Sequence, residues 1–416
     1  MEILNEKNYS KALVIGAGSG RDIASSVLVT DKLRKLGIGV DLAGFLTPWA
    51  LHTFDGELEK PVNELADKRS RKFIPSREGV FLDSYFEPEL AKLNREFGLE
   101  IGKFYLLSLQ YGTAKLGDQL ERLIKENAYD VVIALDVGGD ILARKKDYPW
   151  LLTPIVDFSC LSILAGLHSR IDSYLTVVAP GADGEIPCRN LQEIFDELKN
   201  KGLVLCTEEM RKSSSNYQAF RRINNEINSR TGSYSNTFRL IEKVVCSKSA
   251  QISETLEKRV SVKGRRWKLS LPVDLRRSLA KGMYHFDLKS IHSIRDVGLS
   301  YKNILEAFVK LKQLGAGGTE VDLSFVPGSM ESGEYKETIF LLTPPERLEE
   351  RVRKGILEYG IKLTSQGDIQ CSAILAKDRH AFNLPPNLDV QEKDGCFGTV
   401  AILTTKKSST GFEIAS

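Results

Sequence analysis

The chain has 416 residues, of which 42% are hydrophobic and 27% are charged, and its formal net charge is +3. These values are typical of a soluble globular protein that has enough residues for a large core and more than one domain. The charge is too small to favour nucleic acid as a partner, and no apolar run approaches the ~18–20 residues of a membrane span. The polar segment Met1–Ser10 lacks the pattern of a signal peptide, so we expect a cytoplasmic protein.

The cysteines and histidines show no spacing typical of a metal site or a disulfide framework. No two cysteines form a C-x-x-C pair, so the sequence predicts reduced thiols. The residues in question are Cys160, Cys188, Cys206, Cys246, Cys371 and Cys396, and His52, His168, His285, His292 and His380.

In the first half of the chain, short apolar stretches alternate with stretches of helical periodicity. This βαβ rhythm predicts an α/β protein with a Rossmann-like, doubly wound, mainly parallel sheet. The expected strands are Lys11–Ile15, Ile38–Phe45, Phe104–Leu109, Asp130–Leu135 and Tyr174–Ala179, with a further short one at Leu203–Cys206. The expected helices are Ile23–Leu36, Pro88–Phe97, Ala114–Asn127, Leu151–Leu167 and Leu191–Lys199.

The remainder of the chain predicts a smaller α+β unit after a polar middle region. We place the Rossmann-like domain at residues 1–300, with its core at 9–210, and the smaller unit at 301–416. The expected elements after residue 210 are helices Ala219–Asn228, Asn236–Cys246, Tyr301–Leu314 and Glu346–Tyr359, and strands Val321–Val326, Thr338–Leu342 and Val400–Thr404. Leu58–Arg77 is expected to be an exposed excursion, and the basic clusters Lys68–Lys72 and Lys263–Lys268 are interpreted as solvated charge.

The first candidate site is the turn after the first strand, which contains Gly16, Gly18, Gly20, Arg21 and Asp22. Glycines at a strand end let backbone N–H groups approach a phosphate closely, and an arginine adds a fixed charge. The spacing is G-x-G-x-G and differs from the G-x-G-x-x-G dinucleotide fingerprint. The alternative is that this segment only turns the chain.

The same turn, read as GAGSGRD, resembles the glycine loop of S-adenosylmethionine-dependent methyltransferases. That resemblance implies that Asp41, in the next strand, accepts hydrogen bonds from ribose hydroxyls. The chain departs from the pattern at Val14, where such loops usually carry an acid two residues before the first glycine.

The second candidate site follows the fourth strand, where Asp136 and Asp140 flank Gly138 and Gly139. Paired carboxylates can hold Mg²⁺ beside a phosphate, or one can act as a base whose pKa the other raises. Asp157 is a candidate third oxygen ligand if its helix packs back over the turn. The alternative is that Asp136 and Asp140 only cap the turn through backbone hydrogen bonds.

The third candidate is the turn Gly181–Glu185, in which Asp183 offers similar chemistry. Turns that follow strands of a parallel sheet lie at the same, carboxyl edge of that sheet. We therefore expect Gly16–Asp22 and Asp136–Asp140 to face one shared pocket.

Four motifs together resemble a prokaryotic family known only as a domain of unknown function. They are the glycine loop with its acid, the run Asp136–Ala143, the segment Thr153–Asp157 and the turn Ala179–Glu185. The resemblance extends from Lys11 to Asp322, with Phe325 onward as an addition. The family has no established activity, so the resemblance supports the fold and the sites and leaves the reaction open.

The leading interpretation is an enzyme that acts on a phosphorylated or nucleotide-like, anionic small molecule. Asp22, Asp136 and Asp140 would supply acid–base chemistry, and Mg²⁺ is the candidate cofactor. The alternatives are a methyltransferase and a non-catalytic nucleotide-binding sensor. The sequence leaves a homo-oligomer open.

Overall fold

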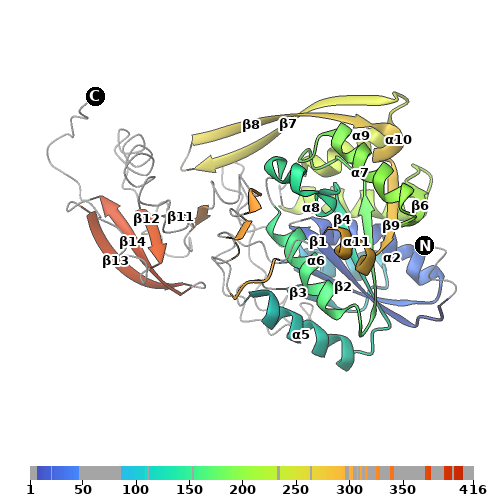
Figure 1. The fold of residues 1–416 in the computed structure, drawn as a ribbon, viewed down its shortest axis with the longest axis horizontal. Coiled ribbons are helices and arrows are strands. Elements are labelled where there is room, and N and C mark those ends of the chain that lie inside the picture. Colours follow the sequence, from blue (N-terminus) through green and yellow to red (C-terminus); the bar gives the residue numbers. More distant parts are fainter. Residues whose placement is uncertain are drawn as a thin grey trace.

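The computed structural model of the chain (Figure 1) describes one large α/β unit and several strands of the C-terminal region. The described residues are 7–19, 21–45, 86–107, 109, 112–151, 154–231, 235–262, 265–295 and 299–302, and further 307, 310–311, 314–316, 325–327, 338–341, 371–375, 388–395 and 398–405.

The large unit is built on one seven-stranded sheet, which confirms the predicted fold class. The strand order is β3 (Phe104–Leu107), β2 (Gly39–Phe45), β1 (Lys11–Ser19), β4 (Val131–Val137), β5 (Asp172–Val178), β9 (Gly282–Asp287) and β6 (Val204–Glu209). Strands β1 to β5 pair in parallel, and β9 runs antiparallel to both β5 and β6. The five strands expected from the first half of the chain therefore share one sheet, as predicted.

Strand β4 lies in the middle of this sheet, and all seven of its residues are buried. It pairs with β1 on one side and β5 on the other. A central parallel strand is covered on both faces, which explains why its sequence is continuously apolar before Asp136.

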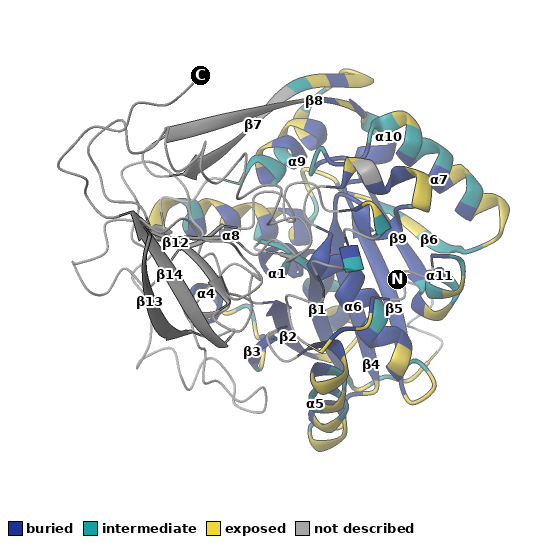
Figure 2. Ribbon diagram, turned by 60° about the vertical axis from the view of Figure 1, so that its left-hand side comes forward, coloured by how far each residue is buried: buried dark blue, intermediate teal, exposed yellow. Residues whose placement is uncertain are grey.

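Helices cover both faces of the sheet and bury two apolar clusters against it (Figure 2). One layer contains α5 (Gly112–Glu126), α6 (Ile155–Leu167), α7 (Cys188–Asn200) and α11 (Leu288–Ile294). The other contains α1 (Asp22–Ser25), α2 (Val27–Lys35), α4 (Glu87–Phe97), α8 (Ser215–Thr231) and α9 (Asn236–Cys246). The result is the doubly wound, three-layer arrangement expected of strands joined by crossover helices.

Several predicted helices differ from the structure in their bounds, and two of these differences have a clear local cause. The segment expected as one helix, Ile23–Leu36, forms α1 and α2 with a break at Ser26, whose Oγ hydrogen bonds to the carbonyl of Asp22. Such local side-chain bonds compete with continuous helix geometry. Helix α6 begins at Ile155 instead of Leu151, because Pro154 disfavours helical conformation in the residue before it.

A long hairpin and an antiparallel strand were not predicted. Strands β7 (Gln251–Val262) and β8 (Arg265–Arg276) form the hairpin, which extends beyond the large unit in Figure 1. The basic cluster Lys263–Lys268 spans the turn of the hairpin and the start of β8. The side chains of this cluster lie outside the described residues. Strand β9 follows the short helix α10 (Arg277–Ala280) and completes the sheet between β5 and β6.

The C-terminal region contains a separate five-stranded, mostly antiparallel sheet. Its order is β10 (Phe325–Pro327), β11 (Thr338–Leu341), β12 (Cys371–Leu375), β14 (Gly398–Thr405) and β13 (Leu388–Gly395). Three of these strands overlap the predicted ones. The predicted helix Glu346–Tyr359, most of Tyr301–Leu314, and the excursion Leu58–Arg77 with its basic cluster lie outside the described residues. The boundary at residue 300 stays a prediction.

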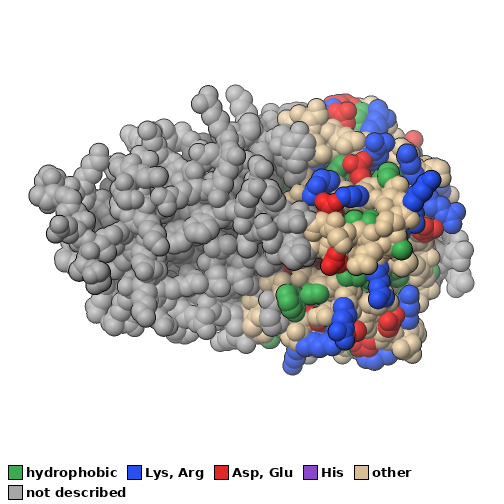
Figure 3. Space-filling view, turned by 90° about the horizontal axis from the view of Figure 1, so that it is seen from above, with side chains coloured by type: hydrophobic (Ala, Val, Ile, Leu, Met, Phe, Trp, Pro, Cys, Tyr) green, Lys and Arg blue, Asp and Glu red, His purple; other side chains and the backbone are tan. Residues whose placement is uncertain are grey.

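Among the helices that the structure describes, none is long and apolar enough to cross a membrane. On the face shown in Figure 3, the described part of the surface carries acidic and basic side chains side by side. This mixture agrees with the small net charge of the chain.

Candidate functional site

The turn after β1 depends on close backbone packing at Gly16. A Cβ at this position would lie 2.5 Å from the backbone nitrogen of Ile23, the second residue of α1. Only glycine permits this approach, which brings the start of α1 directly onto the end of β1. Gly20 lies outside the described residues.

Asp22 joins this turn to the end of β4. Its carboxylate oxygen Oδ2 accepts hydrogen bonds from the backbone N–H groups of Gly18 and Val137, each at 3.1 Å. The first two glycine-acid turns therefore lie side by side, which confirms that both belong to one edge of the sheet.

The second turn is tightened by its own glycines. The Asp136 carboxylate accepts a hydrogen bond from Gly139 N–H at 2.9 Å, and Gly138 and Gly139 adopt φ values of 120° and 95°. A Cβ on Gly138 would lie 2.3 Å from the carboxyl carbon of Asp183. The glycines thus let the third turn, Gly181–Glu185, pack against the second.

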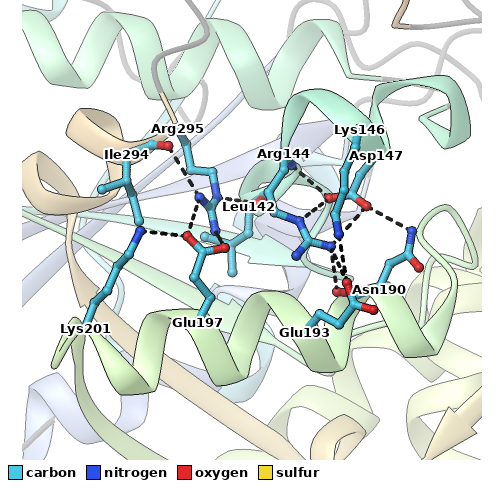
Figure 4. A network of polar contacts seen from close by, with 10 residues as sticks. All are labelled: Leu142, Arg144, Lys146, Asp147, Asn190, Glu193, Glu197, Lys201, Ile294 and Arg295. Carbon is cyan, nitrogen blue, oxygen red and sulfur yellow. Dashed lines mark hydrogen bonds and ion pairs between the residues drawn. The ribbon is translucent and has the colours of Figure 1, made fainter.

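A short 3-10 helix, Asp140–Leu142, carries Asp140, and side chains from outside this segment hold it in place. Buried Arg295 donates from Nε to the carbonyl of Leu142 at 2.9 Å, and its Nη1 pairs with Glu197 of α7 at 3.3 Å (Figure 4). Arg144 binds Asp147 at 2.7 Å on the other side of the segment. These contacts hold the backbone that presents Asp140.

Three acids from different elements converge at this edge. Asp136 comes from β4, Asp140 from the 3-10 segment and Asp157 from the first turn of α6. Each offers a carboxylate oxygen, and these oxygens all lie within 4.8 Å of one another. All three residues are buried, and Oδ1 of both Asp136 and Asp157 has no hydrogen-bond partner among the residues that the structure describes. We call Asp136, Asp140 and Asp157 the carboxylate cluster.

Burial and mutual repulsion raise the pKa values of this cluster. Burial raises the pKa of Asp136 to about 6, although hydrogen bonds with Asp140 and Gly139 oppose that rise. Burial, followed by the charge of Asp157, raises the pKa of Asp140 well above its usual range. The pKa values of Asp157 and Asp22 are raised by burial and then by the charge of Asp136. Like charges at this spacing cannot all be ionised without a cation.

Among the described residues, no basic side chain compensates these acids directly, because neither a lysine nor an arginine forms an ion pair with any member of the carboxylate cluster. An all-oxygen donor set with unpartnered, buried lone pairs suits a hard divalent cation such as Mg²⁺ or Mn²⁺. Asp183 and Glu185 lie close enough to act on the cluster, because each raises the pKa of Asp140.

Arg21 lies apart from the carboxylate cluster. Its guanidinium donates to Asn228 of α8 at 2.6 Å and stacks 4.9 Å from the ring centre of Phe86. Burial lowers its pKa to about 10. The arginine thus ties α8 and the start of α4 to the first turn.

Asp41 also lies away from the cluster, near the amino end of β2. It accepts a hydrogen bond from Lys103 N–H at 2.7 Å, another from the Tyr129 hydroxyl, and pairs with Lys11 at 3.3 Å. These partners fix Asp41 within the packing at the edge opposite the glycine turns.

A second group of potential metal ligands, which was not predicted from the sequence, lies at the β6 edge of the sheet. Cys206 and Glu208 of β6 and His285 of β9 offer ligand atoms within 4.8 Å of one another. The sequence contains a detectable signal for two of these ligands, because Cys206 and Glu208 alternate on one strand. It contains no signal for their pairing with His285, since that pairing requires strand β9, which was not predicted.

The fold and the cluster define an α/β protein with a buried carboxylate site at the carboxyl edge of its sheet. The chain belongs to the DUF1152 family, described as a protein of unknown function, whose model matches residues 13–234. The match covers just over half of the chain and is shorter than the expected Lys11–Asp322.

Solved structures with a related arrangement include two deacetylases. The zinc-inhibited form of teicoplanin deacetylase Orf2 is 9% identical, with a TM-score of 0.31, and the match covers 56% of this chain and 91% of that one. The N,N'-diacetylchitobiose deacetylase from Pyrococcus horikoshii is 13% identical, with a TM-score of 0.27, and the match covers 57% of this chain and 79% of that one. No curated protein matches the chain. Similarities this low carry no inference about activity.

Proposed function

We propose that the chain is a divalent-cation-dependent enzyme that acts on a phosphorylated or nucleotide-like small molecule. The carboxylate cluster would hold the cation, with Mg²⁺ as the expected ion. The proposal rests on one observation: three buried carboxylates meet within 4.8 Å, and two of them have an oxygen without a hydrogen-bond partner among the described residues.

A cation is the simplest way to stabilise this arrangement. Each buried carboxylate loses several kcal/mol of solvation, and neighbouring negative charges add to that cost. A divalent ion offsets both and lets all three acids ionise. Without it, protons must occupy the cluster, as the raised pKa values indicate.

The anionic substrate follows from the charge of the site. The carboxylates repel an anion on their own, whereas Mg²⁺ in proteins is commonly held by one or two carboxylates together with substrate phosphates. The close backbone turns at Gly16 and Gly18 lie beside the cluster and would complete the binding surface. Asp22 and Asp183 would serve as acid–base groups, because both lie against the cluster.

Methyl transfer is the second candidate, and it rests on the resemblance of the glycine turn after β1 to the glycine loop of S-adenosylmethionine-dependent methyltransferases. The close packing at Gly16 supports it, because a Cβ there would meet the backbone of α1. The position of Asp41 opposes it, since a ribose-binding acid belongs at the carboxyl edge. Calorimetry with S-adenosylmethionine decides between the two candidates.

The experiment that tests the leading proposal has two stages. Isothermal titration with Mg²⁺ and Mn²⁺ should show one site in the native chain and none in Asp136→Asn. Turnover is then measured against a panel of nucleotides and sugar phosphates, with and without Mg²⁺. Metal-dependent turnover supports the enzyme, ligand binding without turnover supports the sensor alternative, and a lack of metal binding contradicts the proposal.

A further inference from the structure

We propose that the chain has a second metal site, of a different chemical class, formed by Cys206, Glu208 and His285. The site would take Zn²⁺ or a similar borderline ion. It is independent of the proposed function, because it lies at the β6 edge of the sheet and shares no residue with the carboxylate cluster.

The pairing of the strands places the three side chains on one face. His285 of β9 lies directly opposite Cys206 of β6, and Glu208 is two residues further along the same strand. Residues two apart on a strand point to the same face. The face is the one covered by α2, because Lys32 of that helix forms an ion pair with Glu208.

His285 is the strongest evidence that the group is built for a ligand. The residue is 4% exposed, and within the described part of the chain its Nε2 has no hydrogen-bond partner. That nitrogen lies 3.7 Å from Oε1 of Glu208, which is too long for a hydrogen bond and leaves room for an ion between them. A buried polar atom without a partner is costly, so it calls for an explanation.

The other ring nitrogen of His285 is already held in place. Nδ1 lies 2.9 Å from Oγ1 of Thr176, which occupies the opposite position on β5. An Nδ1–H that donates to this hydroxyl leaves the lone pair of Nε2 directed at Glu208 and Cys206. Burial lowers the pKa of His285 to about 3, so the ring is neutral and can ligate.

The donor set selects the ion. One thiol sulfur, one imidazole nitrogen and one carboxylate oxygen are the mixed ligands that Zn²⁺ accepts, with a fourth position for water. Mg²⁺ strongly prefers oxygen and is not expected here. Cys206 and Glu208 are only partly buried on an edge strand, which gives an ion a path to the site.

Lys32 acts as the competing cation. Its ammonium group forms an ion pair with Glu208, so it neutralises that carboxylate when no ion is bound. An incoming metal must displace it. Lys32→Met should therefore tighten metal binding, which a purely structural role of the group would not produce.

Co²⁺ absorption spectroscopy on the full-length, reduced protein is the direct test. A thiolate ligand gives a near-ultraviolet charge-transfer band, and a tetrahedral site gives visible d–d bands. We expect both bands in the native chain and in Cys246→Ser, the control at an exposed cysteine. Both should disappear on adding Zn²⁺ and be absent in Cys206→Ser.

Two further variants keep the test decisive if one change disturbs folding. Thr176→Val removes only the support of His285 and should weaken Zn²⁺ binding by about 10- to 100-fold. Asp136→Asn should leave the thiolate band unchanged, which separates this site from the carboxylate cluster. The proposal is overturned if the native chain shows no thiolate band, or if Cys206→Ser keeps it while folded.

Discussion

The Asp22 carboxylate accepts a hydrogen bond from the backbone N–H of Val137, at 3.1 Å across 115 residues of sequence. The contact joins the end of β1 to the end of β4 and brings Asp22 to the carboxylate cluster. Two glycine-acid turns that look similar in sequence thus form one structure.

The first prediction concerns the ligand residues. Asp140→Asn should weaken Mg²⁺ or Mn²⁺ binding by about 10- to 100-fold, or about 1.4–2.8 kcal/mol, because it removes one ionised ligand. Without metal, the unfolding free energy of this variant should equal or exceed that of the native chain, since the substitution removes one of several like charges. Calorimetry and urea unfolding measure the two quantities.

Asp41→Asn is the matched control for that change. Asp41 is also buried, but its partners are Tyr129, Lys103 and Lys11 at the opposite edge. This variant should lose stability and keep its cation affinity. If Asp140→Asn unfolds the protein and leaves cation binding by the folded fraction unchanged, the turn is structural.

The second prediction concerns pH. The pKa of Asp136 is raised from 3.8 to about 6 in the folded chain, so the folded state binds more protons than the unfolded state between these values. The contribution of this group to stability without metal is therefore fully present below about pH 3.8 and is lost as the pH rises through about 6, by roughly 3 kcal/mol in total. About 1.4 kcal/mol of this loss falls between pH 5 and pH 7.5, and urea unfolding with a chelator at these two pH values measures it.

Saturating Mg²⁺ should reduce this pH dependence, because the cation replaces the bound protons. The gain in stability from Mg²⁺ should accordingly be larger at pH 7.5 than at pH 5. Equal gains at both pH values would contradict proton–metal exchange at the cluster.

The third prediction tests the close approach of the second and third turns. Gly138→Ala should destabilise the fold by about 1–3 kcal/mol, because a Cβ would lie 2.3 Å from the Asp183 carboxyl carbon at a φ of 120°. Gly166→Ala on α6 is the control, since a Cβ there meets no atom within 4 Å. It should stabilise the helix by up to about 1 kcal/mol. A neutral Gly138→Ala would show that the turns are not packed together.

The sequence predicted the parallel core because its strands are apolar and end in glycine-acid turns. It also predicted the acids that meet at the site, since parallel strands carry their turns to one edge. Asp41 shows the limit of this reasoning: a distance along the chain does not reveal which end of a strand a residue occupies. The structure assigns it near the start of β2, opposite the turns.

Other features depend on pairings that have no local signal. Strand β9 inserts between β5 and β6 from more than 70 residues after β6, and only this insertion brings His285 to Cys206. Arg295 likewise reaches Leu142 across 153 residues. Periodicity within a segment cannot reveal such contacts.

The fourth prediction tests the support of the 3-10 segment. Arg295→Met removes the donor to Leu142 and leaves Glu197 without that partner, so the fold should lose about 2–4 kcal/mol. Mg²⁺ affinity should fall as well, because Asp140 is less firmly placed. Lys146→Met, which removes an exposed ion pair with Glu193, should change stability by less than about 1 kcal/mol. A similar effect of both changes would contradict an anchoring role for Arg295.

A crystal structure with Mn²⁺ would show directly whether the carboxylate cluster holds a cation, because anomalous scattering locates the ion. We expect one peak bounded by carboxylate oxygens of Asp136, Asp140 and Asp157, at oxygen-ligand distances of about 2.0–2.3 Å. Well-ordered crystals grown with Mn²⁺ that show no peak among these carboxylates, or a peak only elsewhere, would contradict this expectation.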